Sequence, residues 1–294
     1  MTASAALVVD PVTGLAHMFS HPFIRSAFLG GTGIAVASGL VGYFVVLRSQ
    51  VFSGDALSHV AVTGALGALA AGIDVAFGLY GACVVVAIGL ALLGARGRAD
   101  DTVIGSVFAW ILGLGALFLT IYTTSSSGVD ATSGISVLFG SIFGLSSGRA
   151  VADATVGLGI AVGVVAIARP LLFASVDDAV ASARGVPVRA LGFVFLVLVG
   201  VTAAAATQAV GALLLLGLLA TPAGAAQRLT ARPFVAFALS AAIAVGSTWV
   251  GLVVSYAAPT VPPSFGILAA AVGCYVVAWS ATLGRARAHG AVRG

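Results

Sequence analysis

The chain is a succession of apolar blocks, most of them close to 20 residues long, and this recurring length restricts its fold more than any other feature. A helix rises about 1.5 Å per residue, so about 20 apolar residues cross the hydrocarbon core of a bilayer. The blocks occupy residues 24–47, 55–72, 76–94, 103–124, 151–168, 191–206, 208–227, 234–256 and 264–283. The sequence therefore predicts an integral membrane protein that crosses the bilayer many times.

The composition excludes a soluble domain and indicates helices. Hydrophobic residues make up 60% of the chain and charged residues only 7%, with a mean hydropathy of +1.17, whereas soluble domains carry about 25% charged residues. In lipid, only helices or a closed barrel satisfy every backbone hydrogen bond. Barrel strands alternate apolar and polar residues, whereas these blocks are apolar all round. We predict an all-α, polytopic transmembrane bundle that forms one domain over residues 1–294.

Arginine placement predicts the orientation of the bundle, because connectors rich in basic residues stay in the cytoplasm. The Arg-rich connectors contain Arg96 and Arg98, Arg169 to Arg189, Arg228 and Arg232, and Arg285, Arg287 and Arg293. The tail 284–294 is therefore expected in the cytoplasm, and connectors 123–133 and 257–264 outside. Block 134–147 is too short to cross comfortably and is expected to be re-entrant or interfacial. We expect eight or nine spans, and the side of the N-terminus stays open.

One apolar block opens with ionisable residues, in the segment Gly54-Asp55-Ala56-Leu57-Ser58-His59. Asp55 and His59 are four residues apart and therefore share one face of a helix. A carboxylate and an imidazole on adjacent turns form a natural half-site for a divalent metal ion. Two copies of the chain would supply four ligands. The alternative is that Asp55 only caps the helix and that His59 faces water at the membrane interface.

A polar connector, residues 175–187, has the pattern of a short capped helix. Asp177 and Asp178 lie near its start, where acidic groups favour the helix dipole. Arg184 lies at its end, and Gly185 follows as a C-cap residue. Without further information, this segment is equally well a solvated helix between two spans.

Six short motifs follow one another along the chain. In chain order they are Val46-Leu47-Arg48, Gly54 to His59, Asp100-Asp101-Thr102-Val103-Ile104-Gly105, Leu138-Phe139-Gly140-Ser141-Ile142, Gln208-Ala209-Val210-Gly211 and Ala220-Thr221-Pro222-Ala223. Together they resemble the patterns VLRR, GDALSH, EDTAIG, LFGSI, QAVG and TPAA of the zinc/manganese-type metal-ion ABC transporter permeases. The resemblance extends over residues 22–283. Ser49 stands where the family pattern has a second arginine.

The resemblance implies a fold like that of type II ABC importers, in a bacterial cell membrane. It implies a homodimer with a cytoplasmic ATP-binding subunit and an extracytoplasmic metal-binding protein as partners. Asp55 and His59 match the positions that the family assigns to the metal. The connector matches the coupling helix that contacts the ATPase, with the residues Asp177, Asp178, Ala181, Arg184 and Gly185. The cargo would be zinc or manganese, and iron is a further candidate.

Other functions are weighed against this one. No cofactor is expected to stay bound, and no pattern indicates nucleic-acid binding. A G-x-x-x-x-G-K-[ST] loop is absent from the sequence, so ATP hydrolysis would belong to a separate chain. A stand-alone secondary transporter is the first alternative, although no convincing inverted repeat supports it. An intramembrane enzyme using Ser58 and His59 is the second, although adjacent helix residues point about 100° apart.

Overall fold

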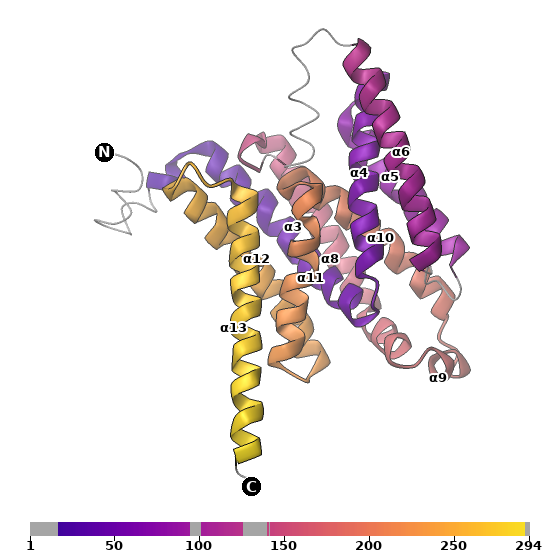
Figure 1. Cartoon of the computed structure of the whole chain (residues 1–294), viewed down its shortest axis with the longest axis vertical. Helices are drawn as coiled ribbons and strands as arrows, with labels where there is room; N and C mark the ends of the chain where they lie inside the picture. The colour runs from indigo at the N-terminus through magenta and orange to yellow at the C-terminus, as the bar shows by residue number, and fades with distance from the viewer. Residues whose placement is uncertain (1–16, 95–100, 126–139, 141, 292–294) are drawn as a thin grey trace.

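The computed structural model describes residues 17–94, 101–125, 140 and 142–291, and these residues form helices without a strand (Figure 1). The predicted all-α fold is confirmed. The helices are α3 (Pro22–Leu47), α4 (Val51–Ala71), α5 (Val75–Leu93), α6 (Asp101–Ser125), a 3-10 turn η1 (Ile142–Gly144), α8 (Ser147–Val176), α9 (Asp178–Ala183), α10 (Val188–Val210), α11 (Ala212–Leu229), α12 (Pro233–Ala257) and α13 (Pro263–Ala291).

Seven helices within the described residues are long and apolar enough to cross a membrane, so the expected eight or nine spans are an overcount. The seven are α3, α5, α6, α8, α10, α12 and α13. Helix α4 falls outside this set because Asp55, Ser58 and His59 lower its hydropathy. Helix α11 has 18 residues, and its last turn contains Gln227 and Arg228. Half of the expected short block 134–147 lies outside the described residues, and the described half contains η1.

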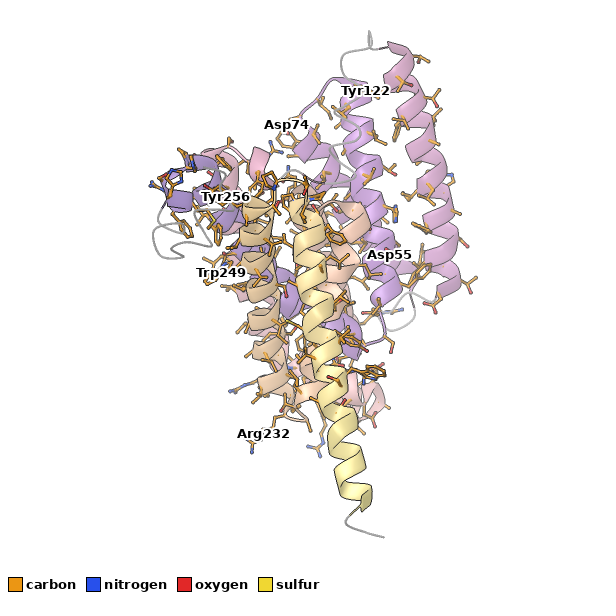
Figure 2. The ribbon with its side chains drawn as sticks, turned by 60° about the vertical axis from the view of Figure 1, so that its left-hand side comes forward. Asp55, Asp74, Tyr122, Arg232, Trp249 and Tyr256 are labelled. Atoms are coloured by element: carbon orange, nitrogen blue, oxygen red, sulfur yellow. The ribbon has the colours of Figure 1, made fainter. Side chains whose placement is uncertain are left out.

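Short connections make successive helices run in opposite directions, so the bundle has two distinct ends. Arg232 lies at one end, whereas Asp74, Tyr122 and Tyr256 lie at the other (Figure 2). The short helix α9 lies at the Arg232 end (Figure 1). Helix α13 continues beyond the expected end of its span, so most of the expected tail 284–294 is helical.

Small residues bring the helices of the bundle into close contact. Helix α3 is central: 72% of its most apolar stretch is buried, against 11% in α6. It packs closely on α8, where Gly33 touches the backbone of Ala154. The Ser240 hydroxyl on α12 donates a hydrogen bond to the Gly39 carbonyl on α3 (2.6 Å). A similar contact positions α4, because Gly64 lies directly against Gly78 and Ala82 of α5.

Candidate functional site

Helix α4 places Asp55 inside the helix, so the alternative that Asp55 is its N-cap is wrong. The helix starts at Val51, and Gln50 is the residue before it. A tight turn joins it to α3. Ser49 has a φ of 55°, and the backbone N–H of Gln50 donates to the Val45 carbonyl (2.8 Å). This turn starts α4 early enough for Asp55 to lie in its second turn, where its side chain is free of a capping role.

Asp55 and His59 are both half-buried on the side of α4 that faces α6. The His59 ring lies 5.1 Å from the ring of Phe108 on α6, in an edge-to-face contact. One turn further along, the Thr63 hydroxyl donates to the Ile111 carbonyl on α6 (3.2 Å). These contacts fix the rotation of α4 and the direction of its polar face. Figure 2 shows Asp55 on α4, well away from Tyr256 and Trp249.

The pair supplies two potential metal ligands and no more. Within the described residues, no group of three or more His, Cys, Asp or Glu side chains is close enough to hold a metal ion. A single copy of the described chain therefore offers half of a four-ligand shell. The Ser58 hydroxyl is fully buried and donates to the Asp55 carbonyl (2.6 Å). Because this hydroxyl already donates its proton to a carbonyl of its own helix, the intramembrane-enzyme alternative gains no support.

The short capped helix predicted in connector 175–187 is present as α9. The Asp177 carboxylate accepts hydrogen bonds from the amides of Ala179 and Val180, both at 2.9 Å. Gly185 ends the segment with a φ of +80°, a left-handed conformation that glycine adopts without strain. The acidic start and the glycine stop both lie where the sequence predicted them.

The predicted coupling residues differ in exposure. Ala181 is fully buried and packs with Ala174 of α8 and Val188 of α10, so it holds α9 in place and is not available at the surface. Arg184, in contrast, is exposed. A groove of about 610 Å³ runs between α9 and the start of α10. Its lining residues are Asp178, Ala179, Ser182, Pro187, Val188, Arg189 and Ala190.

A second polar cluster inside the bundle was missed by the sequence reasoning. Asp153 of α8 is only 3% exposed, and Arg149 lies one turn before it on the same face. Gln208 of α10 joins them when its side-chain amide is oriented with the nitrogen toward Asp153: the nitrogen then donates to the Asp153 carboxylate (3.3 Å), and the oxygen accepts from the Arg149 guanidinium. The available signal was an acidic residue within the apolar block 151–168. This cluster connects α8 to α10 through Oδ1 of Asp153, whereas its buried Oδ2 atom has no hydrogen bond among the described residues.

Comparisons with known proteins agree with this architecture. The model of the ABC 3 transport family matches residues 20–281. The manganese transport system membrane protein MntC of Halalkalibacterium halodurans is 28% identical over 236 residues, covering 80% of this chain and 79% of the relative. The manganese import system permease protein ScaB of Streptococcus gordonii is 28% identical over 248 residues, covering 80% and 82%.

A solved structure supports the fold independently. The structure of PsaBC from Streptococcus pneumoniae in complex with a Fab contains a chain that matches with a TM-score of 0.77. The match covers 90% of this chain and 94% of that chain, at 24% identity, and it therefore concerns the fold alone. The family match spans most of the sequence and agrees with the motifs of metal-ion permeases. The chain therefore belongs to the ABC 3 transport family, as a multi-pass permease of the metal-ion ABC transporters.

Proposed function

We propose that this permease carries a divalent metal ion along the interface between two copies of itself, with Asp55 and His59 of each copy as transient ligands. The observation that carries the proposal is the placement of these two side chains, one turn apart on α4 and half-buried toward α6. Two carboxylates and two imidazoles would complete a four-ligand shell that neither copy forms alone. A shell assembled from two chains can open when they move apart, which release of a transported ion requires.

Manganese is the ion that we propose first. The related proteins MntC and ScaB are named as manganese transport proteins. Carboxylate oxygen suits manganese, whereas imidazole also suits zinc and iron. Because the pair contains one ligand of each kind, zinc and iron are expected to compete with manganese rather than to be excluded.

We propose that a cytoplasmic ATP-binding subunit docks on the groove beside α9, so that its movement reaches α4 through Arg48. The Arg48 side chain is 4% exposed and donates to the Ser175 hydroxyl in the last turn of α8 (3.3 Å). Its guanidinium also lies 5.8 Å from the ring centroid of Phe195 on α10. Arg48 is the C-cap residue of α3 and lies three residues before α4 begins. A shift of α9 therefore has a short packed route to the helix that carries Asp55.

The two ends of the bundle fit this arrangement. The end with α9, Arg232 and the C-terminus would face the cytoplasm, because connectors rich in arginine stay inside. The opposite end, with Asp74 and Tyr256, would then receive the ion from an extracytoplasmic metal-binding protein. The bilayer would be a bacterial cell membrane, like those of the bacterial relatives MntC and ScaB.

The test is uptake of radiolabelled manganese by cells that depend on this transporter. Asp55→Asn and His59→Gln keep the side-chain size but remove a charged or imidazole ligand, so both should abolish uptake. Asp74→Asn is the matched control: Asp74 is exposed at the other end of the bundle and caps α5 through its Oδ1 atom, a role that asparagine preserves. All three variants should reach the membrane in wild-type amounts.

Wild-type uptake by both ligand variants would reject the proposed route. In the same cells, the inhibition of labelled manganese uptake by added zinc or iron ranks the preference of the transporter for the three ions. Co-purification of an ATP-binding subunit with the chain separates an ATP-driven importer from a secondary transporter, since the latter would transport manganese without one.

A further inference from the structure

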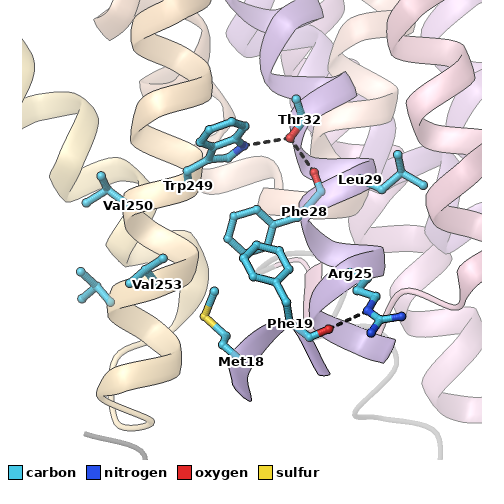
Figure 3. A pocket seen from close by; sticks show the side chains of 10 residues that line it. Met18, Phe19, Arg25, Phe28, Leu29, Thr32, Trp249, Val250 and Val253 are labelled. Carbon is cyan, nitrogen blue, oxygen red and sulfur yellow. Dashed lines mark hydrogen bonds between the residues drawn. The ribbon is translucent and has the colours of Figure 1, made fainter. Parts of the chain in front are cut away.

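An open apolar groove runs along the outside of the bundle between α3 and α12 (Figure 3). It lies toward the C-terminal end of α12, where Tyr256 is located. Its volume is about 810 Å³, within the range of small-molecule sites. Its lining residues are Met18, Phe19, Arg25, Phe28, Leu29, Thr32, Trp249, Val250, Val253 and Val254. Only Arg25 in this set carries a charge, and it lies at one end of the groove (Figure 3).

The groove opens toward the lipid and not toward the interior of the bundle. Leu29, Val250 and Val254 are apolar residues of spanning helices, and they are 49%, 52% and 42% exposed. Exposed apolar side chains on a span contact lipid tails. A concave apolar surface in this position matches the shape and chemistry of an acyl chain.

The polar side chains within the groove satisfy each other. The Trp249 indole N–H donates to the Thr32 hydroxyl (2.9 Å), and that hydroxyl donates in turn to the Phe28 carbonyl (2.6 Å). Neither group is left to attract a polar ligand. The occupant of the groove beyond Arg25 must therefore be apolar.

Arg25 differs from these groups because it retains binding capacity. Its Nε donates to the Phe19 carbonyl (2.6 Å), and the guanidinium is exposed. Helices α3 and α12 contain no acidic residue, so neither wall of the groove offers a carboxylate to pair with it. A guanidinium presents a fork of N–H donors that fits a phosphate group.

Its position corresponds to the headgroup level of a membrane. Arg25 lies in the first turn of α3, close to a cluster in which the His21 ring is 5.6 Å from Phe23 and 6.3 Å from Tyr256. Aromatic residues concentrate at this level, where hydrocarbon meets the headgroups. Arg25 also lies at the end of the bundle opposite Arg232, so it does not belong to the Arg-rich end that sets the orientation.

We infer that this groove is a binding site for an acidic phospholipid, whose acyl chain lies between α3 and α12 and whose phosphate contacts Arg25. An acidic headgroup is favoured over a zwitterionic one because the groove offers no anionic group for a choline or ammonium moiety. A solvent-exposed ion pair contributes about 1 kcal/mol at most, which corresponds to about a fivefold preference for the acidic lipid. The inference is independent of the proposed metal route.

The experiment measures the first lipid bound to the purified full-length protein by native mass spectrometry, with phosphatidylglycerol or phosphatidylcholine added. The wild type should bind phosphatidylglycerol about five times more tightly. Arg25→Gln should abolish this preference. Arg232→Gln, at the opposite end of α12, is the matched control and should retain it. Equal binding of the two lipids by the wild type, or an unchanged preference in Arg25→Gln, would overturn the inference.

A second pair of variants tests the apolar part of the groove. Val254→Trp fills the groove and should weaken binding of both lipids. Val276→Trp places the same ring at an exposed position of α13 outside the groove, and it should leave lipid binding unchanged.

Two rival occupants of the groove would give different results. If residues 1–16 fill the groove, deleting them should increase lipid binding; if a second copy fills it, Val254→Trp should separate a dimer without changing lipid binding. Either result would overturn the lipid site.

Discussion

Two glycines three residues apart on α5 give a sharp test of how tightly α4 is held. A Cβ atom at Gly78 would meet the Gly64 carbonyl oxygen and come within 2.6 Å of the Ala68 Cβ, both on α4. At Gly81 a Cβ atom would have no atom of another described helix within 4 Å. Gly78→Ala and Gly81→Ala are therefore the same substitution in the same helix, with and without a steric conflict.

The two substitutions should change the free energy of unfolding in opposite directions. Gly78→Ala should cost about 1–3 kcal/mol, the usual cost of adding a methyl group to a packed core, because the obstruction is helix backbone that cannot rotate away. Gly81→Ala should change stability by less than this, with a gain of about 0.4–1 kcal/mol from the restricted unfolded chain.

The free energies can be measured by SDS titration of the protein in mixed micelles, followed by circular dichroism. Metal uptake should fall with Gly78→Ala only, because α4 carries Asp55 and His59 and must shift to admit the methyl group. If the two variants have equal stability, the close contact between α4 and α5 does not exist as described. The reasoning about the position of the half-site would then fail with it.

Two further substitutions test the other polar features. Asp153→Ala should lower the free energy of unfolding by about 1–3 kcal/mol, because the half-buried Gln208 side-chain amide loses its acceptor. Asp153→Asn should cost less. The same SDS titration measures both variants, and equal losses would contradict the proposed contact. Asp177→Ala removes the two N-cap hydrogen bonds of α9, at a cost of about 1 kcal/mol. Backbone amide exchange in residues 179–183 should then accelerate, and metal uptake should fall. Asp177→Asn should keep the wild-type exchange rate and the wild-type uptake. Unchanged exchange in Asp177→Ala would show that the cap does not stabilise α9.

The features that the sequence predicted well are those with a strong local cause. The apolar blocks predicted the helices because a helix satisfies its backbone hydrogen bonds within lipid, and because these blocks lack the alternating pattern of barrel strands. Connector 175–187 predicted α9 because Asp177 and Gly185 are specific start and stop signals. The span count was less accurate, because α4 combines a spanning length with Asp55, Ser58 and His59, and length and hydropathy then disagree.

The features that the sequence could not predict depend on contacts between distant helices. Ala181 was expected at the docking surface, but its environment is set by Ala174 and Val188, which only the fold brings to it. Gln208 was noted only as part of a motif, and its role with Arg149 and Asp153 arises from the crossing of α8 and α10. The α3–α12 groove likewise joins residues more than 200 positions apart.

Two aspartates within the bundle show how the cost of an intramembrane charge can be met in different ways. A carboxylate at the centre of a span costs about 2.5–3.5 kcal/mol. Asp153 is buried and meets part of this cost through Gln208 and the neighbouring Arg149, which tie it to the α8–α10 contact. Asp55 is half-buried, and its carboxylate has no hydrogen bond within the described part of the chain. Its cost is offset only if water or a cation reaches it, which supports the proposal that Asp55, and not Asp153, binds the passing ion.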